Sequence, residues 1–227
     1  MECTRFASAF LFSRRNNVII LSQSDINRVK PDMVFYKFSN RSMSWDICHG
    51  EFLTAKKSGT INKRELALHL MGFLGSWGMY CRQAPLLLNH HYLVHEDLID
   101  ILMNKKYDPL FGVNNLVDFK NNITLMYDAY DDISNYYKAL GVSRVITLSS
   151  KIMLGVYGCV PAFDNKVNNA LAILQCKNST VFKTKLKLLN NYISNNPELD
   201  KFIKSELKKH PDYTYMRILD DFLWNYK

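Results

Sequence analysis

Residues 140–167, with the sequence LGVSRVITLSSKIMLGVYGCVPAFDNKV, hold the residue types best suited to chemistry. Gly141 ends one helical pattern, a tight turn follows, and a second helical pattern runs on until Pro161 breaks it. Backbone N–H groups at the start of the second helix, with the Arg144 guanidinium, could bind an anion. Asp164 then opens a third helical pattern, where aspartate is among the best N-caps.

This arrangement resembles the hairpin and the catalytic segment of the helix-hairpin-helix DNA glycosylases. In that superfamily an L-P-G-V-G-R type hairpin precedes a helix, and a V-P-V-D segment with a catalytic aspartate follows it. The matching residues here are Leu140, Gly141, Val142 and Arg144 in the hairpin, and Val160, Pro161 and Asp164 in the aspartate segment. The chain departs from the family pattern at Ser143, which replaces a glycine, and at Ala162 and Phe163, which lengthen the aspartate segment.

The resemblance implies that the hairpin binds a DNA phosphate and that a base leaves the stack. Asp164 would stabilise the positive charge that develops on the sugar and orient a water molecule. Ile146 stands where lyase-type members carry a nucleophilic lysine, so only the glycosidic bond would be cleaved. The resemblance allows a monovalent cation at the hairpin and implies no other cofactor. The phosphate contacts would come from Gly141, Val142, Ser143 and Arg144.

Further candidates for contact with double-stranded DNA lie on both sides of the aspartate and in the segment SWGMYCRQ. Lys151 and Lys166 could reach DNA, although a solvated surface lysine is the ordinary alternative for Lys151. A flipped base needs an aromatic face to stack on, and side chains that fill the gap left in the duplex. The candidates for these roles are Trp77, Tyr80, Arg82 and Gln83, with a plain core position as the alternative for Trp77.

The elements that must position these residues are helical, so we predict an all-α, two-lobed fold of the helix-hairpin-helix glycosylase type. A single domain over 1–227 is the simplest organisation, because the chain has no repeat and no flexible linker. Short β-branched and aromatic runs predict a small strand region at 17–38. Apolar spacing predicts helices within 61–80, 116–140, 147–158 and 164–176, and again at 181–195, 198–209 and 212–225.

Glycines gather in the helix predicted within 61–80, which contains Gly72, Gly75 and Gly78. Because glycine inside a helix costs about 1 kcal/mol relative to alanine, we expect another helix or a ligand to approach closely there. The SWGM segment of this helix and the VPAFD segment also resemble those of a group of uncharacterised bacterial proteins, from which no function follows.

Composition narrows the class of protein. Of the 227 residues, 48% are hydrophobic and 22% charged, as in globular chains. The formal net charge of +8 favours a partner that carries phosphate. No apolar run is long enough to span a membrane, and we expect the N-terminal segment not to act as a secretory signal. The five widely spaced cysteines suit reduced thiols in the cytoplasm.

Other interpretations stay open. His90, His91 and His95 form a local cluster, yet without H-E-x-x-H or a nearby cysteine we predict no metal site. His49 and Glu51, near Trp45 and Asp46, could form an acid/base pair. The lysines at 183–187 and 201–209 are either solvated helix faces or further DNA contacts. The rival functions are a non-catalytic DNA-binding protein and a helical interaction or defence-system protein that uses the same scaffold.

Overall fold

The computed structural model describes residues 19–33, 43–80, 89–174, 176 and 179–227. These residues form helices joined by short connections, and none of the described residues is in a strand, so the all-α prediction is confirmed. The α-helices are α1 (Gln23–Val29), α2 (Met43–Ser58), α3 (Lys63–Ser76), α5 (Glu96–Leu102), α6 (Leu116–Asn121), α7 (Ile123–Ala139), α8 (Val145–Tyr157), α9 (Asn165–Ile173), α10 (Phe182–Ser194), α11 (Pro197–Lys209) and α12 (Tyr215–Asn225). Three short 3-10 helices lie between them: η1 (Lys30–Asp32), η2 (Tyr92–His95) and η3 (Lys105–Gly112).

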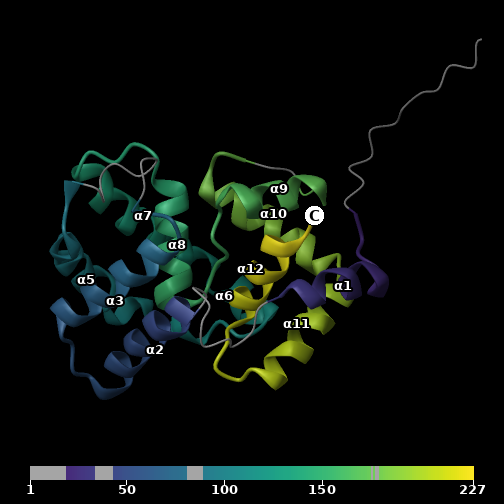
Figure 1. The fold of residues 1–227 in the computed structure, drawn as a ribbon, viewed down its shortest axis with the longest axis horizontal. Coiled ribbons are helices and arrows are strands. Elements are labelled where there is room, and N and C mark those ends of the chain that lie inside the picture. Colours follow the sequence, from purple (N-terminus) through teal and green to yellow (C-terminus); the bar gives the residue numbers. More distant parts are fainter. Residues whose placement is uncertain (1–18, 34–42, 81–88, 175, 177–178) are drawn as a thin grey trace, which may run out of the picture.

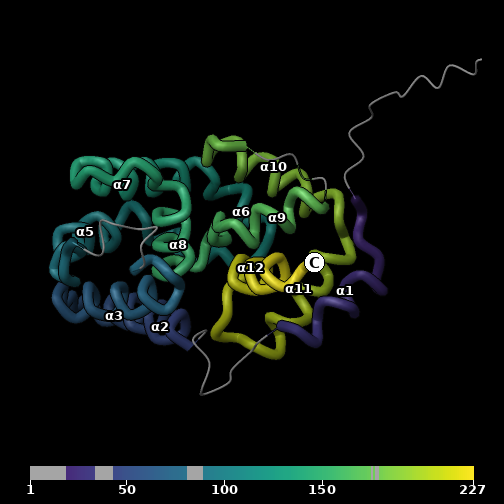
Figure 2. Tube along the Cα trace, turned by 45° about the horizontal axis from the view of Figure 1, so that its top comes forward, coloured from purple at the N-terminus to yellow at the C-terminus, as the bar shows by residue number. Residues whose placement is uncertain are grey.

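The helices lie in two groups (Figure 1). One group contains α2, α3, α5, α7 and α8, and the other contains α1, α6 and α9–α12. Helix α8 packs against α2, α3 and α7, on the side of the first group that faces the second (Figure 2). The chain crosses between the groups after α8, so residues 158–164 and the start of α9 lie where the two groups meet.

Helix α1 corrects the strand prediction for 17–38. The described part of this range, 19–33, contains α1 and η1 instead of strands, and residues 17, 18 and 34–38 lie outside the described residues. The reason is a capping box: the Ser22 hydroxyl accepts from the N–H of Asp25, and the Asp25 carboxylate accepts from the N–H of Ser22. This local pairing satisfies two N–H groups of the first turn and starts a helix in a β-branched context.

Helix α8 is the most buried helix near the centre of the molecule. Almost all of its residues are buried, which fits its apolar sequence VITLSSKIMLGVY. At Gly155 the α3 helix comes so close that an added Cβ would lie 2.5 Å from the Phe73 ring. No other helix approaches the glycines predicted for such a contact: within the described residues, a Cβ at Gly72 or Gly78 would meet nothing within 4 Å, and one at Gly75 would meet only the Tyr80 ring at 3.8 Å. The alternative, a ligand near these glycines, stays a prediction.

The helix predicted over 116–140 is interrupted. Asn122 separates α6 from α7, and its side-chain amide donates to the carbonyl of Asp118, 2.9 Å away. The two parts have different neighbours, since α6 packs against α10 while α7 packs against α8 and α5. Periodicity could not show this break, because the apolar spacing continues across it.

The other predicted helices agree with the structure within a few residues, whereas α2 and α5 were not predicted. Pro197 occupies the first turn of α11, where its missing N–H has no cost, and Pro211 precedes α12. Cys48, Cys159 and Cys176 are buried free thiols, while Cys3 and Cys81 lie outside the described residues. In the part of the chain that the structure describes, every helix is too short or too polar to cross a membrane.

Candidate functional site

The turn at 141–144 joins α7 to α8, as predicted. Gly141 adopts a left-handed φ of 88°, which glycine reaches without strain, and its N–H donates to the carbonyl of Lys138 at 2.9 Å. The N–H of Val142 donates to the carbonyl of Tyr137 at 3.0 Å. Ser143 and Arg144 are exposed. No side chain of the described residues caps the N-terminus of α8, so its first N–H groups have no side-chain acceptor there.

Asp164 is the N-cap of α9, so the capping prediction is confirmed. Its Oδ1 accepts from the N–H of Lys166 at 3.0 Å and from that of Val167 at 3.1 Å. Its Oδ2 lies 3.7 Å from the Nζ of Lys151, and the side chain keeps 17% of its surface exposed. One carboxylate oxygen therefore stabilises the helix, while the other faces an ammonium group at the edge of solvent.

Lys151 is buried, which contradicts its interpretation as a solvated lysine. It lies on α8, whose faces are covered by neighbouring helices, and only 7% of its side chain is exposed. Its Nζ donates to the carbonyl of Trp77 at 2.5 Å, just beyond the end of α3. The structure thus brings together Trp77, Lys151 and Asp164, three of the predicted site residues from three separate segments. We call them the Asp164 cluster.

Trp77 is half-buried and packs against the core, as its alternative interpretation expects, and its role toward a flipped base stays a prediction. Its ring lies 5.0 Å from that of Phe73, as a core residue would, and the Arg217 guanidinium lies 5.5 Å from its ring centroid. The indole N–H is buried and has no hydrogen-bond partner among the described residues. A buried donor without an acceptor is uncommon in folded proteins.

Four predicted residues lie apart from the cluster or outside the described residues. The Tyr80 hydroxyl is 3.0 Å from the Nε2 of His95, so it belongs to a different hydrogen-bond group. Arg82 and Gln83 lie outside the described residues. Lys166 lies two residues after Asp164 in α9, is exposed, and has its Nζ 3.3 Å from the centroid of the Trp224 ring.

Three hydrogen bonds hold the segment that delivers Asp164. The N–H of Ala162 donates to Asp220 Oδ1 at 2.8 Å, and the N–H of Phe163 donates to the Ser150 hydroxyl at 2.9 Å. The Thr147 hydroxyl donates to the carbonyl of Phe163 at 3.1 Å. Because Thr147 lies in the first turn of α8, these bonds fix Asp164 close to the helix that begins at the 141–144 turn.

Sequence reasoning missed Asp220 and Arg217, both fully buried on α12. The Arg217 guanidinium lies 3.9 Å from a carboxylate oxygen of Asp220 and 3.9 Å from one of Asp221. Burial raises the pKa of Asp220 to about 7, although Arg217 and the bond from Ala162 act in the opposite direction. The available signal was an R-x-x-D-D pattern inside the most amphipathic helix, at positions where apolar residues would otherwise be expected.

Arg217 also connects the cluster to α2. Its guanidinium lies 5.4 Å from the ring centroid of Trp45, 5.5 Å from that of Trp77 and 5.7 Å from that of Tyr213. A desolvated guanidinium among aromatic faces gains more from each contact than an exposed one does. The residue therefore connects the first group of helices to the second at the level of the site.

The histidine cluster does not assemble. His90 and His91 are exposed, whereas His95 is buried with its two ring nitrogens at the hydroxyls of Tyr80 and Tyr137. No group of three or more ligand side chains that could hold a metal occurs among the described residues.

The predicted lysine faces are largely paired. Lys183 contacts Asp131 at 2.8 Å and Lys204 contacts Asp200 at 2.6 Å, while Lys185 is buried and donates to the side chain of Asn168 at 2.7 Å. These pairs describe helix faces that already have acidic partners, and contact with DNA stays a prediction for them.

The strongest arrangement of predicted residues is thus the Asp164 cluster behind the 141–144 turn. It combines a partly exposed carboxylate, a buried ammonium group and an indole with an unused donor. No family model, curated protein or solved structure matches this chain, so its function has to be inferred from this geometry.

Proposed function

We propose that this chain is a monofunctional DNA glycosylase that hydrolyses the glycosidic bond of a modified base flipped out of the duplex. The observation that carries the proposal is the partly exposed Asp164 carboxylate, which lies in a cluster with Lys151 and Trp77. This carboxylate follows α8, the helix whose N-terminus has no side-chain cap. The helix-hairpin-helix layout and a cytoplasmic location belong to the same proposal. The two groups of helices and the buried free thiols support them.

The turn would bind one DNA phosphate. The N–H groups at the start of α8, which no side chain of the described residues caps, would offer donors, and the exposed Arg144 just before them would offer positive charge. Such a contact fixes the position of the duplex without reading its sequence. The net charge of +8 supports the same assignment through counterion release.

Asp164 would act on the sugar of the flipped nucleotide. Its Oδ1 is occupied by two helix N–H groups, which holds the carboxylate in one orientation. Its Oδ2 would stabilise the positive charge that develops as the glycosidic bond breaks, and would orient the attacking water. Lys151 would set the position of Oδ2, and Trp77 would offer its face or its unpaired N–H to the base.

The test uses duplexes that carry a panel of modified bases and measures abasic sites. Asp164→Asn removes the charge but keeps the cap, because asparagine caps as well as aspartate does. We expect the variant to bind DNA with unchanged affinity and to lose activity by about a hundredfold or more. Asp128→Asn, at an exposed position of α7, loses the same charge and should retain full activity. Equal activity in the Asp164 variant and wild type would overturn the proposal.

Arg144→Ala separates binding from chemistry. Loss of one phosphate contact should reduce the slope of log affinity against log salt concentration by about 1 and weaken all duplexes equally.

A non-catalytic DNA-binding protein is the second candidate. The observation that favours it is that the cap and Lys151 together account for both oxygens of Asp164 without a substrate. Salt-sensitive binding with no abasic product for any base would support this candidate. If the protein does not bind DNA even at low salt, the third possibility, a helical interaction or defence-system protein, is favoured.

A further inference from the structure

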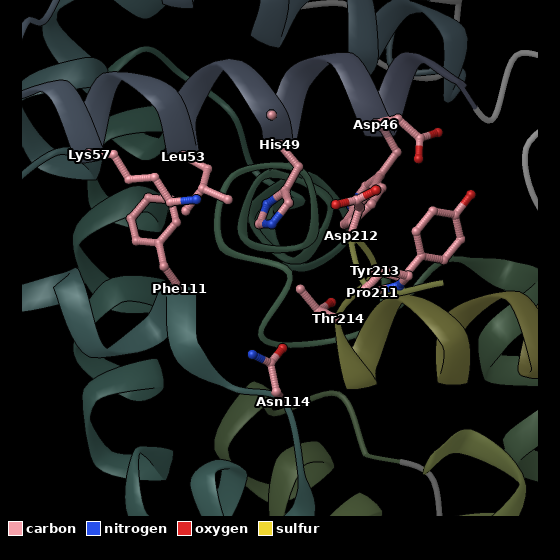
Figure 3. A pocket seen from close by; sticks show the side chains of 12 residues that line it. Asp46, His49, Leu53, Lys57, Phe111, Asn114, Pro211, Asp212, Tyr213 and Thr214 are labelled. Atoms are coloured by element: carbon pink, nitrogen blue, oxygen red, sulfur yellow. The ribbon is translucent and has the colours of Figure 1, made fainter. Parts of the chain in front are cut away.

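A second site lies away from Asp164, beneath α2. The pocket there encloses about 340 Å³ and lies between α2, the chain after η3 and the segment 211–214 before α12 (Figure 3). Its size is at the lower end of the range for small-molecule sites. Its lining residues include Trp45, Asp46, His49, Lys57, Asn114 and Asp212.

The charges in this pocket are separated. Figure 3 shows Lys57 and Phe111 at one end, Asp46 and Asp212 at the other, and the ring of His49 projecting from α2 between them. Two carboxylates against one ammonium group leave the lining acidic, in a chain whose net charge is +8. The lining side chains therefore carry a net negative charge, and the buried Arg217 guanidinium lies against the rings of Trp45 and Tyr213, which also line the pocket.

His49 supplies a hydrogen-bond acceptor. Only 5% of the residue is exposed, and burial lowers the pKa of its imidazole to about 4, so the ring is neutral at pH 7. Its Nδ1 lies 2.9 Å from the carbonyl of Val156 and must carry the proton, since a carbonyl can only accept. Nε2 is then an acceptor, and it has no hydrogen bond to any described residue.

Aromatic rings hold the imidazole in place. The ring of His49 stacks on Trp45 with centroids 4.8 Å apart and an interplanar angle of 14°, and Phe111 lies on its other side at 6.5 Å. A fixed acceptor that no described residue pairs, between the charged ends of a pocket, can accept a hydrogen bond from a donor on a ligand.

We propose that this pocket binds a small zwitterion with an excess of positive charge, a free amino acid with an amino or guanidino side chain. The cationic group would lie between Asp46 and Asp212 and donate a further hydrogen bond to His49 Nε2. The ligand carboxylate would face Lys57 and the amide of Asn114. The net charge of such a ligand offsets the net charge of the lining. The site does not include Asp164 and does not depend on the activity proposed there.

Calorimetric titration of the full chain with L-arginine and L-lysine tests the proposal. We expect one of them to bind at one site per chain, and L-glutamate and a nucleoside monophosphate not to bind. Asp212→Asn, on the exposed part of the lining, should weaken binding about tenfold or more, since it removes a charge-assisted hydrogen bond. Asp128→Asn is the control for loss of charge elsewhere and should leave the affinity unchanged.

The orientation of the ligand has a separate test. Agmatine is arginine without its carboxylate, so it should bind more weakly than arginine to the wild type. Lys57→Met should reduce the affinity for arginine to that for agmatine and should not weaken agmatine. Thermal unfolding of each variant checks that it is folded. The proposal is overturned if neither amino acid binds, if only glutamate or the nucleotide binds, or if folded Asp212→Asn binds as wild type does.

Discussion

Asp220 changes charge within an ordinary range of pH because burial raises its pKa to about 7 from 3.8. The folded protein therefore binds more protons at this position than the unfolded chain does, between about pH 4 and pH 7. In that range the free energy of unfolding falls as pH rises. The loss amounts to a few kcal/mol, since each tenfold change in proton affinity corresponds to about 1.4 kcal/mol.

Asp220→Asn should remove this dependence while keeping an oxygen for the N–H of Ala162. We expect the variant to gain stability relative to wild type as pH rises from 4 to 8, measured by urea unfolding at a series of pH values. Parallel curves for the two proteins would contradict the prediction.

His95 changes the free energy of unfolding with pH in the opposite direction. Burial lowers the pKa of its imidazole to about 4 from 6.5, so the unfolded chain binds more protons between these values. The free energy of unfolding therefore falls as pH falls from 6.5 toward 4, by about 3 kcal/mol in all. His49 behaves in the same way. Since Asp220 acts in the opposite direction over the same range, the free energy of unfolding of the wild type changes less with pH than the contribution of Asp220 or of the histidines would by itself.

His95→Gln isolates the histidine contribution. We expect the variant to be less stable than wild type at pH 7, because the bonds to Tyr80 and Tyr137 are altered, and to lose less stability on acidification. Thermal unfolding at pH 7 and pH 5 measures the difference. His90→Gln, at an exposed position, should follow the wild type. A loss on acidification as large as that of wild type would count against this account of His95.

At the scale of elements, the contact between α3 and α8 depends on Gly155. A Cβ there would lie 2.5 Å from one atom of the buried Phe73 ring and 2.7 Å from the next, and neither ring nor helix has room to move far. Gly155→Ala should therefore destabilise the protein by about 1–3 kcal/mol despite the higher helix propensity of alanine.

Gly72→Ala is the matched control, because it places the same change in the partner helix. An added Cβ there meets nothing within 4 Å among the described residues, so we expect an increase in stability of up to about 1 kcal/mol. Chemical unfolding of both variants gives the comparison. The account of this helix pair fails if the two substitutions shift stability in the same direction.

At the scale of the whole molecule, Arg217 couples the two groups of helices. It lies on α12 in one group and contacts the rings of Trp45 and Trp77, which belong to the other. Arg217→Met leaves Asp220 and Asp221 without their cation and should cost about 3–5 kcal/mol.

A double-mutant cycle checks this coupling. Because asparagine needs no counter-charge, Arg217→Met with Asp220→Asn should be more stable than the sum of the two single effects predicts, by at least about 1 kcal/mol. Urea unfolding followed by the fluorescence of tryptophans, two of which lie against Arg217, measures all four proteins. Strict additivity would show that the guanidinium and Asp220 do not depend on each other.

The sequence by itself determined the features that depend on neighbours a few residues apart. The all-helical class and most helix ends follow from apolar spacing, from Gly141 and from the prolines. The cap at Asp164 is also local, because its side chain accepts hydrogen bonds from the N–H groups of the next two to three residues. The capping box at Ser22 is equally local. The strand prediction at 17–38 was wrong there because it rested on the β-branched residues and did not take this helix-starting pair into account.

Only the tertiary structure decided which of these elements meet. Lys151 is buried because helices from both sides of the chain cover α8, and its contacts with Trp77 and Asp164 join residues 74 and 13 positions away. The pocket beneath α2 likewise unites His49, Phe111 and Asp212, which no spacing relates. Local hydrogen bonds are set by a few consecutive residues, whereas contacts between distant segments depend on how all the helix surfaces pack at once.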